Sequence, residues 1–327
     1  MIENSIVTGK RQAPWVGIGK SGEWHDYREA LDAAGLNFSV RSERAKVELP
    51  AVPCMAADPS FSMLTTMFED VPNTNVNIRE QDNKILGVVS DNYAIVQNID
   101  AFSLLDPFTA AGGVIQHAGM TEQGLVFMVL HIRKENMLGD DWDFDVMCTN
   151  SFNGGFPLAL IMVPTRIICQ NMYRKLMGNN DALLHVRHGA HANYRLSAAT
   201  SATSGIMGYI AAFEHTLELA DAKSYSHKDI QNILLPMLFP YPKEGGKREL
   251  TFKAKTDELR KEFMDRYYDA SDNRKYHGKA LGFINAYYDY LSHHDPSKNM
   301  PGSWTDRRLN GLINSNDIKT NLIRKVL

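Results

Sequence analysis

Alternating apolar and polar residues in the middle of the chain predict a β-hairpin. Residues 142–150 place large apolar side chains on one face of an extended chain and aspartates on the other. Residues 156–163 read FPLALIMV and are apolar on both faces, which is typical of a strand covered on both sides. The intervening Asn153-Gly154-Gly155 can supply the positive φ values of a tight turn. We therefore expect the two strands to be antiparallel neighbours.

Similar patterns predict further elements on the N-terminal side of this hairpin. Period-two stretches indicate strands, and apolar residues spaced by three or four indicate helices. Helices are expected at 24–34 and 98–111, and strands at 36–50, on both sides of Ser90-Asp91-Asn92, and twice within 113–132.

After residue 200 the apolar residues recur at helical spacing, for example at Ile206, Tyr209, Ile210, Phe213 and Leu217. The segment GKALGFINAYYDYLSHH is a further aromatic-rich helix. The chain is therefore predicted to be an α+β protein, in which an antiparallel sheet with β-hairpins is backed by helices (a β-β-β-α-like core) and a helical part follows. We expect an N-terminal helix, strand and irregular segment over 1–80, a central α+β core over 81–200 and a helical part over 201–327.

A short cationic helix is expected directly after the hairpin. Pro164 is predicted to end the strand and Thr165 to cap a helix that runs from Arg166 to about Met177, with Gly178 as its terminator. At about 100° per residue, one face would be apolar and could pack on the sheet. The opposite face would carry Arg166, Gln170, Tyr173 and Arg174.

Charge makes this segment a candidate nucleic-acid surface. The whole chain has a net charge of −3, so it is not uniformly basic, whereas 165–195 holds five Arg or Lys and one acid. Arginines can neutralise phosphates and an aromatic ring can stack on a base. An ordinary solvated helix face is the alternative. The candidate nucleic-acid-binding residues are Arg166, Gln170, Tyr173, Arg174, Lys175, Arg187, His188, Tyr194 and Arg195.

Other chemistry is weakly represented in the sequence. His185, His188 and His191 could suggest a metal site, but a spacing of three puts successive residues of a strand on opposite faces. The aspartates of 140–145 could suggest a magnesium cluster, although an exposed, charge-protected strand face is the favoured interpretation. Phosphate-loop, nucleophile-elbow and HExxH motifs are absent. We expect no catalytic residues, no metal, no cofactor and no enzymatic activity.

The cysteine content and the N-terminal sequence indicate a cytoplasmic protein. Cys54, Cys148 and Cys169 are too few and too scattered for a disulfide framework. The first residues lack the apolar core of a signal peptide, and no apolar run is long enough to span a bilayer. No membrane partner is therefore expected.

The segments GVVSDNYAIVQNIDAF, TNSFNGGFPLALIMVPTRIICQNM and VRHG resemble the phage/plasmid-like protein family, a domain of unknown function found in phages, prophages and plasmids. This chain has Phe152-Asn153 where members often have His-Asp, and Gly189 where a Thr commonly follows Arg-His. The resemblance implies a mobile-element protein that works on DNA or against a host system.

The predicted order of elements, a helix, antiparallel strands and then a basic helix, is also similar to the core of single-strand annealing proteins such as RecT, Red-beta and the Rad-type annealers. That layout implies a groove for single-stranded DNA within a ring or filament of subunits. The leading hypothesis is accordingly a non-enzymatic, homo-oligomeric protein that binds or anneals single-stranded DNA, in the host cytoplasm if phage-encoded. The alternative is an accessory protein that binds a host defence or replication protein through the aromatic segment 283–290 and Trp304.

Overall fold

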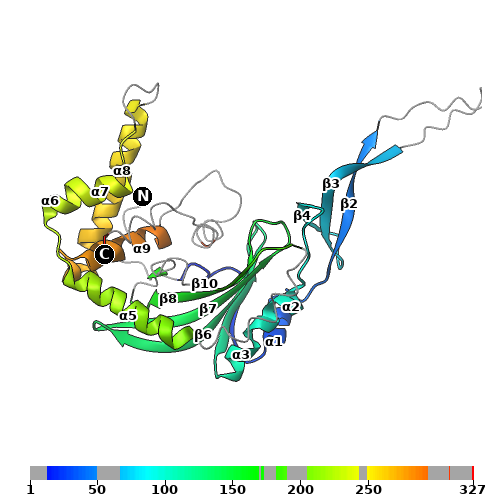
Figure 1. Ribbon diagram of the computed structural model, residues 1–327, viewed down its shortest axis with the longest axis horizontal. Helices are drawn as coiled ribbons and strands as arrows, with labels where there is room; N and C mark the ends of the chain where they lie inside the picture. Colours follow the sequence, from blue (N-terminus) through cyan, green and yellow to red (C-terminus); the bar gives the residue numbers. More distant parts are fainter. Residues whose placement is uncertain are drawn as a thin grey trace, which may run out of the picture.

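The computed structural model describes residues 13–49, 67–168, 171–172, 182–189, 205–242, 249–293, 309 and 326–327. A curved sheet forms the body, a smaller sheet projects from one end as an arm, and the C-terminal helices gather at the other end (Figure 1). The predicted α+β class is confirmed, with antiparallel sheets and a helical C-terminal part.

Within the described residues, the large sheet has seven strands, in the order β1-β5-β6-β7-β8-β10, with β9 also paired to β8. All of its pairings are antiparallel. The predicted central hairpin is confirmed, because β7 and β8 pair with Val146 opposite Met162 and Thr149 opposite Ala159. The strands are β1 (Lys20–Trp24), β5 (Val114–Met120), β6 (Leu125–Met137), β7 (Asp140–Ser151), β8 (Leu158–Arg166), β9 (Asn171–Met172) and β10 (Ala182–Val186).

Both faces of this sheet are covered, which explains why residues 156–163 are apolar throughout. One face, which includes Leu160 and Met162, packs on helices α1 (Tyr27–Ala33), α2 (Asn98–Phe102), α3 (Asp106–Ala110) and α5 (Ile206–Ala222). A 3₁₀ turn, η1 (Ser103–Leu105), joins α2 to α3. The other face, which includes Ile161 and Val163, packs on Trp15, Ile18 and Leu309.

The arm, as far as the structure describes it, is a three-stranded antiparallel sheet of β2 (Val40–Leu49), β3 (Met67–Arg79) and β4 (Ile85–Ser90). A second strand was expected after Asn92, and this prediction is wrong. The chain turns there, with the Tyr93 amide donating to the Ser90 carbonyl, and runs irregularly into α2. The side chain of Gln97 instead bonds both the N–H and the carbonyl of Val40, so the segment pairs with the arm through a side chain.

The C-terminal helices confirm the helical pattern predicted after residue 200. Ile206, Tyr209, Ile210, Phe213 and Leu217 are all buried on one face of α5. Helix α9 is buried on all sides, so the aromatic segment 283–290 is core and is not a docking surface. Beyond α5, the elements are α6 (His227–Asp229), η4 (Ile230–Leu234), α7 (Leu235–Leu238), α8 (Glu249–Asp269), η5 (Arg274–Tyr276) and α9 (Ala280–His293).

The prediction of a helix from Arg166 to Met177 is wrong. Strand β8 continues through Pro164 to Arg166, and Asn171–Met172 return as β9, which pairs with Thr165 and Arg166. The fixed φ of proline is compatible with an extended chain, so Pro164 costs the ladder one donor without ending the strand. Residues 173–177 lie outside the described part of the chain.

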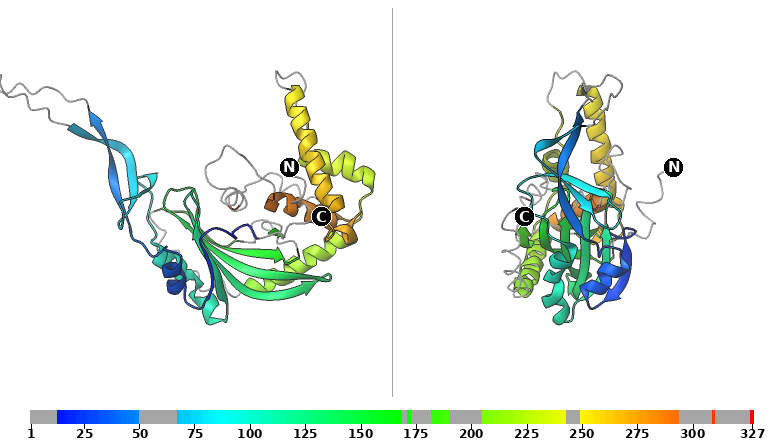
Figure 2. Two further views of the ribbon diagram at one scale, coloured as in Figure 1. Left: turned by 180° about the vertical axis from the view of Figure 1, so that it is seen from behind. Right: turned by 90° about the vertical axis from the view of Figure 1, so that its right-hand side faces the viewer.

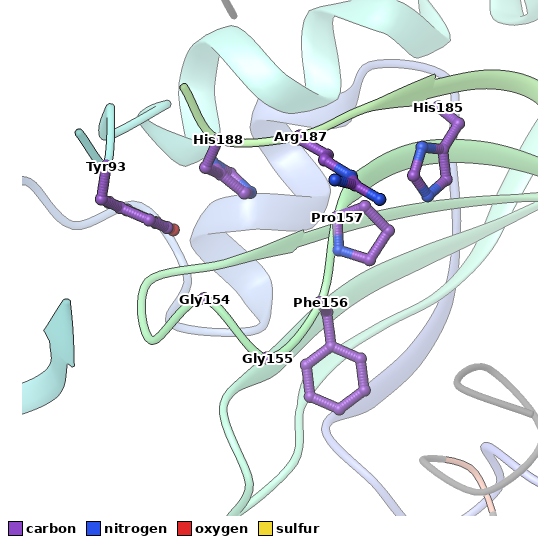
Figure 3. A pocket seen from close by; sticks show the side chains of 8 residues that line it. All are labelled: Tyr93, Gly154, Gly155, Phe156, Pro157, His185, Arg187 and His188. Atoms are coloured by element: carbon purple, nitrogen blue, oxygen red, sulfur yellow. The ribbon is translucent and has the colours of Figure 1, made fainter. Parts of the chain in front are cut away.

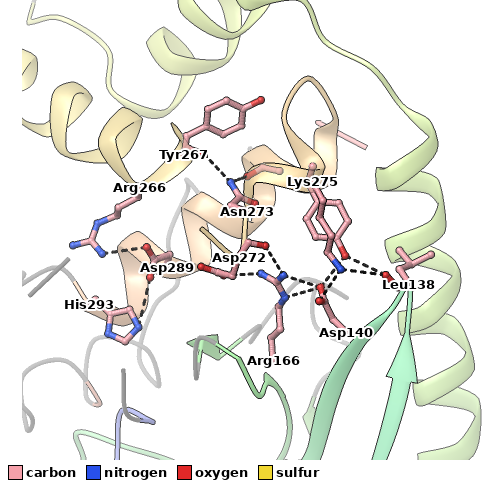
Figure 4. A network of polar contacts seen from close by, with 12 residues as sticks. Leu138, Asp140, Arg166, Arg266, Tyr267, Asp272, Asn273, Lys275, Asp289 and His293 are labelled. Atoms are coloured by element: carbon pink, nitrogen blue, oxygen red, sulfur yellow. Dashed lines mark hydrogen bonds and ion pairs between the residues drawn. The ribbon is translucent and has the colours of Figure 1, made fainter. Parts of the chain in front are cut away.

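Arg166 joins the sheet to the helical part through a buried polar network (Figure 4). Its guanidinium lies 2.7 Å from the Asp140 carboxylate at the start of β7 and 2.9 Å from the Asp272 carboxylate before η5. It also donates to the Asp272 carbonyl. Lys275 and the Tyr276 hydroxyl complete the shell around Asp140 at 2.8 and 2.7 Å. Only 1% of the Arg166 surface is exposed, so this network carries a fully desolvated charge.

Replacing Arg166 should therefore destabilise the fold severely. Arg166→Ala leaves two carboxylates without their common cation, and breaking a buried pair in this way costs about 3–5 kcal/mol. The free energy of unfolding from urea denaturation is the measurement. Lys134→Ala, which removes an exposed cation of β6, should change it by less than about 0.5 kcal/mol. Equal effects of the two substitutions would contradict a structural role for Arg166.

Candidate functional site

A pocket of about 320 Å³ lies where the β7–β8 turn meets the end of β10 and the segment after β4 (Figure 3). Three separate parts of the chain form it, and it combines aromatic rings, a cation and backbone exposed at glycines. The pocket is lined by Tyr93, Gly154, Gly155, Phe156, Pro157, His185, Arg187 and His188.

The floor of the pocket is a turn that side chains hold in place. Gly154 has φ +74°, a value that L-residues rarely adopt. The side-chain oxygen of Asn153 accepts from the Gly155 amide at 2.9 Å, and its amide group donates to the Gln123 carbonyl at 2.8 Å. The turn is therefore fixed both within itself and to the neighbouring β5–β6 turn.

One wall of the pocket consists of two stacked rings. Tyr93 and His188 lie with ring centroids 5.0 Å apart and an interplanar angle of 18°. The Tyr93 hydroxyl donates to the Ser151 carbonyl at 2.7 Å. His188 bonds the Ala94 carbonyl through Nδ1 at 3.3 Å. Each ring is thus anchored at one polar atom while its stacked partner fixes its plane.

His188 is held in the neutral form at neutral pH. Burial lowers its pKa from the usual value of 6.5, opposed by the bond to the Ala94 carbonyl. Because a carbonyl only accepts, Nδ1 carries the proton and Nε2 is an acceptor. Nε2 is buried and has no hydrogen-bond partner among the described residues. Burial also raises the pKa of Tyr93, so its hydroxyl remains a neutral donor.

The structure brings together two of the predicted nucleic-acid-binding residues, Arg187 and His188, which follow β10 directly. Arg187 is exposed and lines the pocket. The prediction that Arg166 contacts nucleic acid is wrong. Its guanidinium is buried between the carboxylates of Asp140 and Asp272, so it cannot reach a phosphate. The other predicted contacts, Gln170, Tyr173, Arg174, Lys175, Tyr194 and Arg195, lie outside the described residues.

Tyr93 and Phe156 line the pocket but were not predicted as site residues from the sequence. Phe156 follows the glycine turn, so its position beside the turn was visible in the sequence. Tyr93 was placed in a strand that does not form, and no local signal connects it with His188. The contact depends on how the segment after β4 lies against the end of β10, and the backbone bond from Ala94 to the His188 carbonyl, at 3.5 Å, marks that approach.

The aspartates of β7 form the exposed face that the sequence suggested only in part, because Asp141 is exposed whereas Asp140 and Asp145 are buried. Asp140 binds Arg166, and Asp145 is buried with its carboxylate 2.9 Å from His131 Nδ1. Burial raises the pKa of Asp145 to about 6, although His131 opposes this shift. The hydrogen bond to Asp145 raises the pKa of His131. Within the described residues, no three His, Cys, Asp or Glu side chains are grouped as metal ligands would be, and His191 lies outside them.

The chain belongs to the family described as a domain of unknown function (DUF932), whose pattern matches residues 85–316. The match includes every residue that lines the pocket. No curated protein and no solved structure matches the chain. In the described part of the chain, no helix is both long enough and apolar enough to cross a bilayer.

If Tyr93 shields His188 from water, removing its ring should raise the pKa of His188 toward 6.5. We expect this shift in Tyr93→Ala, because desolvation is the main cause of the lowered value. Tyr93→Phe keeps the ring and should leave the pKa low. Carbon-detected NMR titration of the His188 ring between about pH 4.5 and 8.5 covers the range in which histidine titrates. An unshifted His188 in Tyr93→Ala would show that other groups cause the burial.

Proposed function

We propose that this protein binds single-stranded DNA without being an enzyme, and that the pocket beside the β7–β8 turn holds one nucleotide of the strand. The observation that carries the proposal is the pocket itself, whose lining combines the exposed Arg187 with the stacked rings of Tyr93 and His188. Sites for single strands combine cations for the phosphates with aromatic surfaces for the bases.

The geometry of the pocket supports each part of this role. The Arg187 guanidinium presents several N–H donors in one plane, which suits a phosphate. Gly154 and Gly155 have no side chains, so a ligand can approach the turn closely. The pocket volume of about 320 Å³ is at the lower end of small-molecule sites, which suits one nucleotide better than a duplex.

The wider hypothesis is annealing by a ring or filament of subunits in a phage, prophage or plasmid context. It is supported by the resemblance to phage/plasmid-like proteins. The similarity of layout to single-strand annealing proteins is weaker than expected, because the basic helix predicted from Arg166 does not form. We retain DNA annealing and recombination as the proposed process, with the pocket in place of that helix. The proposed location is the cytoplasm, which for a phage-encoded protein means that of the host cell.

A second proposal is an accessory protein that binds a host defence or replication protein. The exposed start of α8 favours it, because Leu250 is 82% exposed and Phe252 lies two residues further along. Helix α8, drawn in yellow, projects from the helical end of the molecule (Figure 2). This function predicts capture of a host protein that Leu250→Ser with Phe252→Ser abolishes, together with no intrinsic affinity for DNA.

Single-stranded oligonucleotides should bind with an affinity that falls as salt is raised, because phosphate contacts release counterions. Arg187→Gln should weaken binding by about tenfold, since it removes a charge-assisted contact. Fluorescence anisotropy with a labelled oligonucleotide, at low and moderate salt, measures both effects.

Arg133→Gln is the matched control, because Arg133 is also an exposed arginine but lies on β6 away from the pocket. It should bind as the unmodified protein does. Absence of salt-sensitive binding would eliminate the proposed function. Equal losses in the two variants would instead remove the pocket from it.

Binding should also strengthen as pH is lowered through the range in which His188 titrates. Burial depresses the pKa of His188 in the free protein, and a bound phosphate favours the protonated ring, so binding takes up a proton. The gain is therefore absent at neutral pH and develops below about pH 6.5. His188→Gln should flatten this part of the pH profile of affinity. An unchanged profile in that variant would assign the proton uptake to another group.

A further inference from the structure

The two edges of the arm have opposite chemical character. Strand β2, at one edge, carries Arg41, Glu43, Arg44, Lys46 and Glu48. Strand β4, at the other edge, reads ILGVVS and has no charge. Soluble proteins usually protect an unpaired edge strand with charged residues, because its open N–H and C=O groups can pair with another chain. Of these two edges, only β2 has that protection.

The outward face of the arm is apolar next to the β4 edge. Val76 lies opposite Val88, and Ile78 lies opposite Ile85. All four side chains therefore point to the same face of the arm. Ile85 and Val88 are each 62% exposed. The opposite face is turned to the body, because Asn77 is buried and donates to the Phe152 carbonyl.

Three arginines of the arm are already matched with acids. Arg41 pairs with Glu43, Arg44 with Asp91 and Arg79 with Asp82. A surface for a nucleic-acid backbone needs cations that can exchange their partners for phosphate. The uncharged edge and its apolar neighbours fit a protein strand better than they fit DNA.

We propose that β4 pairs antiparallel with β4 of a second copy of this chain. The two arms then form one continuous six-stranded sheet about a two-fold axis, with the same surface used by both subunits. Val88 of each copy comes opposite or diagonal to Val88 of the other, which removes part of its exposed surface from water. The interface therefore combines backbone hydrogen bonds with a contact between apolar side chains of this strand.

A second copy of the chain is the partner that β4 suits, as a comparison of how β2 and β4 would each pair with their own copy shows. In an edge strand, every second residue points its free N–H and C=O groups away from the sheet. When two copies of the strand pair antiparallel through these groups, the two-fold axis passes beside one residue, which then lies opposite its own copy. An axis at the middle of a strand gives the longest ladder. For β2, an axis at Arg44 sets that charge against its own copy, and an axis at Ala45 sets Arg44 against Lys46. For β4, an axis at Gly87 or Val88 opposes only uncharged residues.

The test is the mass of the full-length protein in solution without DNA, over about a hundredfold range of concentration, by analytical ultracentrifugation. We expect a concentration-dependent dimer. Val88→Lys, which sets like charges together at the axis or next to it, should raise the dimer dissociation constant at least about tenfold. Val47→Lys is the control, since Val47 is also exposed (48%) but lies on β2, and it should dimerise as the unmodified protein does.

Amide hydrogen exchange gives a second, independent readout. Exchange in 85–90 should slow as protein concentration rises, while exchange in 40–49 should not change. A monomer at all concentrations, or a dimer that survives Val88→Lys, overturns the proposal. So does protection of β2 in place of β4. None of these outcomes depends on whether the pocket binds DNA.

Discussion

The buried guanidinium of Arg166 is the interaction on which the two ends of the molecule depend. A charge that is removed from water must be compensated by partners placed close by. Those partners come from the start of β7 and from the segment before η5, 26 and 106 residues away along the chain. The sheet and the C-terminal helices can therefore adopt only one relative position that satisfies all three groups.

The hairpin that ends in Arg166 also builds the pocket at its other end. Strands β7 and β8 run from the ion-pair network to the glycine turn, and their central residues are buried on both faces of the sheet. A close-packed sheet of this kind is stiff. It holds the turn in a fixed position against Tyr93 and the end of β10, so the pocket is formed by a rigid scaffold and not by loops alone.

Local patterns were sufficient to predict the elements whose burial is regular. The alternation in β7, the doubly apolar β8 and the helical spacing in α5 each follow from contacts that repeat along one element. The helix expected at 166–177 failed because a few apolar residues at helical spacing also occur by chance in a short extended segment. Arg166 was assigned to the surface because its acidic partners are distant in sequence, and no local rule connects it with Asp272.

The pocket could be predicted only in part. Arg187 and His188 stood out because cations and histidines cluster in that segment, and the glycine turn was recognised from its own residues. Their meeting with Tyr93 depends on tertiary packing, since it requires the segment after β4 to lie along the end of β10. The same limit applies to the pair His131 and Asp145, whose register across β6 and β7 is set by the whole sheet.

The root of the arm rests directly on the pocket turn at Gly87. A β-carbon placed there would lie 2.4 Å from the Asn153 backbone, so even alanine would force the two segments apart. Asn153 is also the residue whose side chain shapes the turn. A displacement of the arm would therefore act directly on the backbone of Asn153, the residue that shapes the pocket turn, because no side chain separates the two segments.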